Sequence, residues 1–162
     1  MFKGIIHLEE KKLCGLSQRM SMLNNTTEQL WRTFMPLRKH ITDIKSQELI
    51  SMQVYDNKSN ADNFKASTEF TKWAAVEVSD LKNLPEGLFP YVLQGGLYAV
   101  FLHKGTPEQF KITFEYIFRQ WFPNSGYKLD HREHFELLPE NYRPDDPEAI
   151  EEIWIPVVSK GA

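Results

Sequence analysis

The residues best suited to chemistry lie near the end of the chain, where a carboxylate and an indole alternate with aliphatic side chains. Residues 151–158 read as a strand, so Glu152, Trp154 and Pro156 would face one way and the aliphatic residues between them the other. The aliphatic face is typical of core. An indole beside a carboxylate indicates a groove for flat, cationic, partly apolar ligands, which bind by stacking and Coulomb attraction. The alternative is an edge strand with a partly exposed Trp154 and a solvated Glu152.

A second pair of an aromatic ring and an acid lies in an earlier strand-like run, residues 68–80. Trp73 and Glu77 are four apart, and even spacing places both on one face of a strand. Two such pairs in equivalent elements favour the groove. Three tyrosines are further candidates for its walls, although core packing accounts for each one taken alone: Tyr55, Tyr91 and Tyr98.

The densest group of titratable residues is the stretch 130–136. Glu136 would be suited to general acid or base chemistry if it were buried near the groove, and a surface charge is the alternative. His131 and His134 are three apart, which in a strand places them on opposite faces and disfavours a shared metal ion. The sole cysteine, Cys14, lies in a strand-like run and is typical of a small buried residue rather than a nucleophile. We therefore expect no metal and no cofactor.

The pattern of predicted strands and helices that positions these residues occurs twice along the chain. In the second half a strand-like run over 98–102 is followed by Thr106, Pro107 and Gln109, which predict a helix start with a capping box, and then by apolar residues at helical spacing up to about residue 122. In the first half a run over 14–22 precedes a similar box at Thr26 and a second apolar helical face. Two strand-like runs follow each helix, which predicts strand–helix–strand–strand in duplicate.

Several local features complete this reading. Residues 2–8 predict an additional strand, and Pro36 predicts a kink or break in the first helix. Polar or Pro-rich composition predicts loops over 56–65 and 137–149. The fold class is therefore α+β, with an antiparallel sheet, two main helices on one face and a groove between halves of about 10–80 and 91–159.

Composition narrows the possible functions of the chain. The length of 162 residues fits one domain, residues 1–162, and 13% aromatic residues supply a core with rings to spare for a pocket. A net charge of -3 disfavours direct nucleic-acid binding. The chain contains no apolar run long enough to span a membrane and no signal-peptide pattern, and its single cysteine fits a reducing compartment, so we expect a cytoplasmic protein without membrane contact.

Six motifs, taken in order, resemble the GyrI-like family, the effector-binding domain also found in AraC- and MerR-type transcription regulators. They span nearly the whole chain and lie at residues 30–39, 73–78, 96–100, 103–105, 135–136 and 152–157. The resemblance implies a pseudo-twofold groove for apolar or cationic aromatic compounds, with Glu152 or Glu136 as the acid that meets the cation and Trp154 and Trp73 as walls. Two places after the Phe-Glu motif the family usually has an aromatic residue, and this chain has Leu138. Any role that needs the hydroxyl group of such an aromatic residue is therefore in question.

The resemblance leaves three functions open. The first is a stand-alone binding protein for an apolar or cationic aromatic molecule, active in transcription regulation or in drug or toxin sequestration, because the chain has no room for a helix-turn-helix module. The second is a hydrolase of electrophilic aromatic compounds that uses Glu136 or Glu152. The third is an inhibitor that binds a gyrase-like protein, and a transcription regulator is a further possible partner. We favour binding over catalysis.

Overall fold

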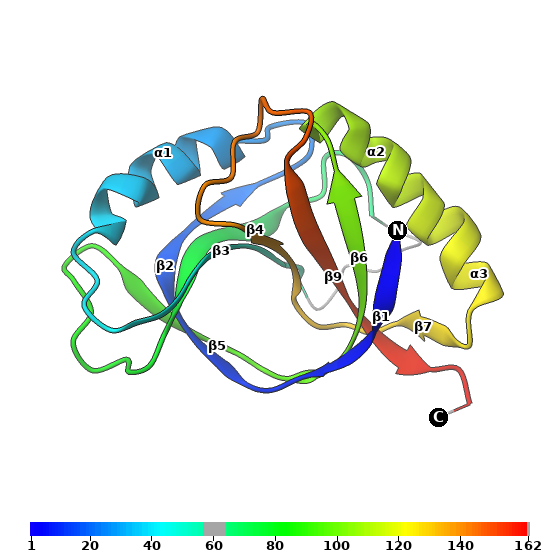
Figure 1. The fold of residues 1–162 in the computed structure, drawn as a ribbon, viewed down its shortest axis with the longest axis horizontal. Helices are drawn as coiled ribbons and strands as arrows, with labels where there is room; N and C mark the ends of the chain where they lie inside the picture. Colours follow the sequence, from blue (N-terminus) through cyan, green and yellow to red (C-terminus); the bar gives the residue numbers. More distant parts are fainter. Residues whose placement is uncertain (57–63, 162) are drawn as a thin grey trace.

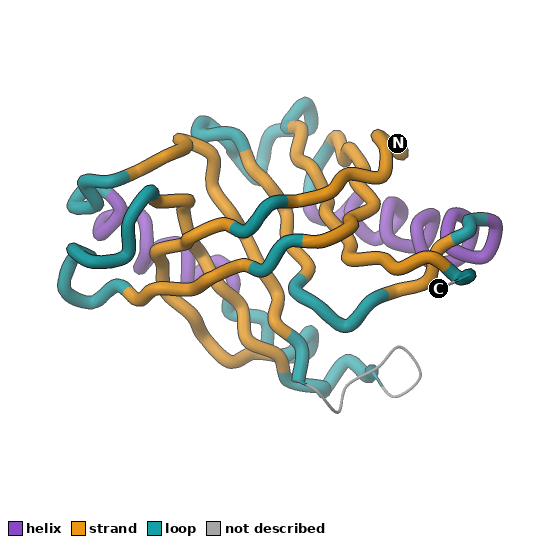
Figure 2. Tube along the Cα trace, turned by 90° about the horizontal axis from the view of Figure 1, so that it is seen from below, coloured by secondary structure: helices purple, strands orange, loops and turns teal. Residues whose placement is uncertain are grey.

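The computed structural model describes residues 1–56 and 64–161, and its described part is a nine-stranded antiparallel sheet that carries helices on one face (Figures 1 and 2). Eight strands follow the order β1-β6-β9-β8-β3-β4-β2-β5, and β7 pairs with β9. The strands are β1 (Phe2–Leu8), β2 (Lys11–Met20), β3 (Ile44–Val54), β4 (Phe70–Val78), β5 (Phe89–Leu93), β6 (Gly96–Lys104), β7 (Tyr127–Leu129), β8 (His134–Leu138) and β9 (Ile150–Ser159). Residues 57–63 of the loop predicted over 56–65 lie outside the described residues.

The sheet order has an internal symmetry that confirms the predicted duplication. Strands β2, β3 and β4 with one helix match strands β6, β8 and β9 with the other, and β3 pairs with β8 at the centre. The two halves exchange their edge strands. Strand β1, which precedes the first half, pairs with β6 of the second half, and β5, which precedes the second half, pairs with β2 of the first. The chain segments that lead from β1 to β2 and from β5 to β6 meet closely, and a side chain at Gly95 would overlap the carbonyl of Leu8. The antiparallel sheet together with its helices confirms the α+β fold class.

The first helix, α1 (Thr27–Arg38), buries Leu30 and Phe34 against the sheet. Thr26 is the N-cap residue as predicted, but the predicted capping box is wrong, because the side chain of Thr26 makes no cap hydrogen bond. Asn25 Oδ1 accepts the backbone N–H of Thr27 at 3.0 Å. The predicted break at Pro36 is also wrong. The helix continues to Arg38, since the hydrogen bond that proline removes falls in its last turn.

The second helix, α2 (Pro107–Tyr116), begins as predicted, with the backbone N–H of Thr106 donating to Gln109 Oε1 at 2.9 Å. It continues through a π-helical turn, Ile117–Trp121, into the short α3 (Phe122–Asn124). Figure 1 shows α1 and α2 on the same side of the sheet, α1 at the left of the view and α2 at the right. None of the helices in the described residues is long and apolar enough to cross a membrane.

Three buried clusters hold the fold together, and their positions define the two faces of the sheet. One cluster lies beneath α1 around Phe34, Ala74 and Val76, and a second lies beneath α2 around Phe101 and Ile153. We call the face that carries both the helix face. The third cluster occupies the opposite face, which we call the far face, and it includes Met52, Trp73, Ala75, Tyr98, Phe135 and Trp154.

Candidate functional site

Polar side chains separate the two apolar clusters of the helix face. Because neighbouring residues in a strand point to opposite faces, the residues that alternate with the far-face cluster must point toward the helices. The register places Ser51 opposite Glu136, and Gln53 opposite Lys72. We call the resulting set the polar floor, and it consists of Ser51 and Gln53 from β3, Lys72 from β4, Glu136 from β8 and Glu151 from β9.

The centre of the polar floor is Glu136, whose side chain is only 12% exposed. Gln53 Nε2 donates to its Oε1 at 3.2 Å, and Lys72 Nζ lies 3.9 Å from the same oxygen. Burial raises the pKa of Glu136, and the Lys72 charge and the Gln53 hydrogen bond partly offset that rise. Burial likewise lowers the pKa of Lys72, against the opposing attraction of Glu136 and Glu151. The two groups form a buried, loosely spaced ion pair.

Glu151 is the second acid of the polar floor and is 7% exposed. Burial, reinforced by the charge of Glu136, raises its pKa to about 7, and hydrogen bonding with Tyr142 and the charge of Lys72 act in the opposite direction. A carboxyl group with this pKa is about half ionised at neutral pH. The polar floor therefore holds one carboxyl group that can gain or lose its proton under physiological conditions.

A loop covers the polar floor on the helix face. Residues 139–149, drawn in orange in Figure 1, cross between α1 and α2, and Tyr142 of this loop packs on the α1 cluster and contacts Glu151. Ion pairs anchor the loop to both halves: Arg38 to Glu140 at 3.8 Å, and Lys104 to Glu148 at 2.7 Å. A hollow of about 220 Å³ lies in this loop and includes Tyr142 in its lining. The loop therefore acts as a roof over the polar floor.

Aromatic side chains line the β3 end of the polar floor. The ring of Tyr55 meets His134 edge to face at 5.0 Å and lies 5.6 Å from Phe70. Burial, with smaller contributions from the charges of His131 and Arg132, lowers the pKa of His134 to about 3. His134 is therefore a neutral ring at physiological pH, and this wall of the site is aromatic and uncharged.

The structure places most of the sequence-predicted site residues on the far face. Trp154 stacks on Phe135 at 5.2 Å and 17°, and its Nε1 donates to Glu152 Oε1 at 3.1 Å. Glu152 also pairs with Lys3. Trp154 is 8% exposed and belongs to the far-face cluster, so it neither points into bulk solvent nor faces the helices. The predicted pairing of Glu152 with Trp154 exists, but as part of the far-face packing.

The remaining predicted residues divide between the two faces. Trp73 packs on Tyr91 at 5.2 Å, and Tyr91 donates to Glu133 at 2.7 Å. Glu77, beside them on the far face, pairs with Lys11 at 3.0 Å. The far face also holds Tyr98, whereas Tyr55 and Glu136 belong to the helix face. Their roles in ligand binding stay predictions, and the structure brings only Tyr55 and Glu136 to the polar floor.

Sequence reasoning missed Lys72, Gln53, Glu151 and Tyr142. Glu151 and Lys72 lie next to the predicted site residues Glu152 and Trp73, and the alternation of side chains along a strand places them on the opposite face. A charged residue inside an apolar run, as Lys72 is between Phe70 and Ala74, was the available signal. Tyr142 lies in a Pro-rich loop, and its contact depends on tertiary structure.

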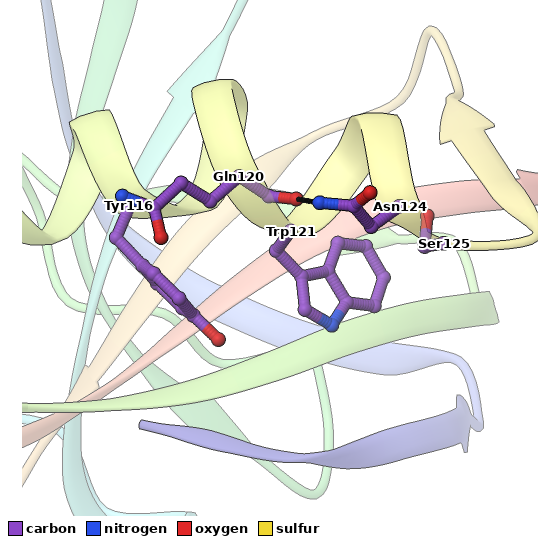
Figure 3. A pocket seen from close by; sticks show the side chains of 5 residues that line it. All are labelled: Tyr116, Gln120, Trp121, Asn124 and Ser125. Carbon is purple, nitrogen blue, oxygen red and sulfur yellow. Dashed lines mark hydrogen bonds between the residues drawn. The ribbon is translucent and has the colours of Figure 1, made fainter.

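A second hollow, of about 270 Å³, lies where α2 passes into α3 (Figure 3). It is lined by Tyr116, Gln120, Trp121, Asn124 and Ser125. The indole of Trp121 meets Phe101 edge to face at 5.2 Å, and Asn124 Nδ2 donates to the carbonyl of Gln120 at 2.8 Å. Its lining has no acid or base to orient a charged ligand, so the polar floor is the better candidate.

Comparison with known proteins assigns the family. The model of the GyrI-like small molecule binding domain matches residues 4–158. The chain belongs to the GyrI-like family. The resemblance carried by the sequence motifs is thereby confirmed over nearly the whole chain.

Individual relatives of this GyrI-like chain include a transcriptional regulator and two solved structures. It is 27% identical over 158 residues to the transcriptional regulator BrlR of Pseudomonas aeruginosa, covering 97% of the chain and 56% of BrlR, so it spans little more than half of that relative. SAV2435 bound to tetraphenylphosphonium has a TM-score of 0.70 at 14% identity, covering 98% of this chain and 94% of SAV2435. The C-terminal domain of EcmrR has a TM-score of 0.70 at 15% identity, covering 98% and 99%.

Proposed function

We propose that this GyrI-like domain binds apolar or cationic aromatic small molecules on its helix face, over the polar floor and beneath the loop 139–149. The observation that carries the proposal is the pair of buried carboxyl groups, Glu136 and Glu151, between two apolar clusters and under an aromatic roof. Buried charges are costly and persist where they are paired or used. The aromatic side chains of Tyr55 and Tyr142 supply flat surfaces for a ring system.

Ligand entry requires the roof to move. The ion pairs that hold the loop 139–149 are partly exposed, since Glu140 is 58% exposed and Lys104 and Glu148 are 59% and 74% exposed. Exposed ion pairs contribute little stability, so the main cost of opening the loop is the removal of Tyr142 from the α1 cluster. A bound cation would replace Tyr142 as the neighbour of Glu151. The structure of SAV2435 with tetraphenylphosphonium, a cationic aromatic molecule, is consistent with a ligand of this kind.

The proposed biological role is transcription regulation or the sequestration of a drug or toxin. BrlR is a transcriptional regulator, and the EcmrR domain shares the fold at low identity. We propose that ligand binding here is read out through a transcription regulator, or through removal of the ligand itself. A gyrase-like partner stays an alternative that the charge of the chain supports only weakly.

The binding proposal is tested by two adjacent substitutions on β9 that differ only in the face they alter. At pH 8, where Glu151 is mostly ionised, we expect tetraphenylphosphonium to bind the wild-type domain and Glu151→Gln to weaken binding about tenfold or more, because the ligand loses a buried counter-charge. Glu152→Gln should change the affinity less than twofold. Isothermal titration calorimetry measures both. Weaker binding in Glu152→Gln alone would place the ligand on the far face, and no binding by the wild type would refute the proposal.

Hydrolysis is a second candidate, favoured by the pKa of about 7 at Glu151, which suits a general acid or base. In this version Glu151 or Glu136 would activate water toward an electrophilic aromatic substrate. The expected result is turnover whose rate falls at least a hundredfold in Glu151→Gln or Glu136→Gln. Turnover that survives both substitutions would exclude these roles.

A further inference from the structure

The polar floor carries a positive charge of its own, from Lys72. Its side chain is 8% exposed, and β4 places it on the helix face between Phe70 and Ala74. Lys72 is thus enclosed with the carboxyl groups rather than extended to solvent, as most lysines are. A ligand that enters beneath the roof meets an ammonium group as well as carboxylates.

The charges of the polar floor are distributed unevenly between the two halves of the domain. Lys72, from the first half, lies 3.9 Å from Glu136 Oε1 and compensates that acid. Glu151, from the second half, contacts the neutral phenol of Tyr142 and feels Lys72 only as a weaker influence. The first half therefore contributes the positive charge of Lys72, and the second half contributes both carboxyl groups, Glu136 beside Lys72 and Glu151 beside Tyr142.

A ligand that carries only a positive charge can use Glu151 but gains nothing from Lys72. It gains attraction from Glu151, but it must enter a low-dielectric space that already contains the Lys72 ammonium, and like charges repel strongly in such a space. A ligand with an anionic group in addition removes this conflict, because the anion can take the place of Glu136 beside Lys72. Glu136 can then accept a proton from solvent, since its buried position favours the neutral acid.

We infer that Lys72 determines ligand charge, and that the site takes aromatic zwitterions, with the anionic group at Lys72 and the cationic group at Glu151. The inference rests on the proposed function, because it specifies which aromatic molecules occupy the same site. A lysine ammonium is a compact donor without directional demands, so it accommodates carboxylate, sulfonate or phosphate on the ligand alike.

The test uses two dyes with one ring system and different charge. Rhodamine B is a zwitterion at neutral pH, and its ethyl ester is a cation of nearly the same shape. Binding is measured by fluorescence anisotropy at pH 7.5. We expect the wild-type domain to bind rhodamine B at least tenfold more tightly than the ester. In Lys72→Met the preference should reverse, because the cation no longer meets the ammonium and the carboxylate loses its partner.

A matched control is Lys45→Met. Lys45 also lies 3.9 Å from a glutamate, Glu77, but its side chain is 64% exposed and its partner belongs to the far face. This variant should keep the wild-type preference. The wild-type comparison stands without any variant, should Lys72→Met fail to fold.

The outcomes separate the inference from the proposed function. Equal or tighter binding of the ester by the wild type overturns the inference. Binding of tetraphenylphosphonium without measurable binding of rhodamine B overturns it as well, while the proposed function stands. If the wild type binds none of the three probes, both fall.

Discussion

Replacing Glu151 by glutamine should stabilise the domain at alkaline pH, although it removes a group that we assign to ligand binding. Burial raises the pKa of Glu151 from its ordinary value of 4.5 to about 7. The folded state therefore binds the proton more tightly than the unfolded chain. The stability linked to this proton is fully present below pH 4.5 and is lost as the pH rises through 7.

The magnitude follows from the size of the pKa change. An increase of about 2.5 in pKa corresponds to about 3 kcal/mol at high pH, and the steepest loss is about 1.4 kcal/mol per pH unit. A glutamine at this position has no charge to bury, so Glu151→Gln avoids the loss. Glu136 and Lys72 respond to the same charge and reduce the difference, and we expect about 1–3 kcal/mol in favour of the variant at pH 8 and about none at pH 4.5.

The assay is urea unfolding followed by tryptophan fluorescence at pH 4.5, 6, 7 and 8. Glu148→Gln is the control, because Glu148 lies three residues away with a side chain that is 74% exposed. The free energy of unfolding of Glu151→Gln should exceed that of the wild type by an amount that grows with pH, and the control should show no such trend. A difference that does not depend on pH, or a variant that is less stable throughout, would refute the assignment of a raised pKa to Glu151.

Three further predictions concern the far face, a buried histidine and the roof. Trp154→Ala should cost about 3–5 kcal/mol in urea unfolding, because the indole is buried against Phe135; a cost under about 1 kcal/mol with lost dye binding would instead support Trp154 as a ligand wall. His134, with a pKa lowered to about 3, should make the wild type lose stability as the pH falls from about 6.5 toward 3, and His134→Gln should flatten that decline in acid unfolding curves. Lys104→Gln should leave the thermal midpoint unchanged but speed limited proteolysis within residues 139–149, because it removes the ion pair that holds Glu148 of the loop. Unchanged cleavage would show that this ion pair does not hold the loop.

The architecture was accessible from the sequence because its signals are local. Apolar side chains at helical spacing and the capping box at Thr106 identified α2, and the same features repeated in the first half indicated the duplication. The short strand β7 and the exchange of edge strands between the halves carried no such local signal. The hydrogen bond from the backbone of Thr27 to Asn25 was missed because the side chains of Asn25 and Thr26 are both suited to accept backbone N–H groups at a helix start.

The candidate site was less accessible because alternation along a strand gives two faces without saying which one the helices cover. On β9 the residues Glu152 and Trp154 formed the more suggestive set, and the structure places them against the far-face core, whereas Glu151 faces the helices. Leu8 of β1 and Leu93 of β5 belong to the same buried cluster as Trp154, so the far face buries this indole without any ligand, and the sequence does not reveal that packing. The alternative acid that the family resemblance offered, Glu136, does lie in the polar floor.

The most direct test of the account is a crystal structure of the domain with tetraphenylphosphonium. The account predicts the ligand on the helix face, with a phenyl ring near Tyr55, the phosphonium nearest to Glu151, and Tyr142 moved away with the loop 139–149. Electron density for the ligand beside Trp154 and Glu152 on the far face, with the roof still closed, would contradict it.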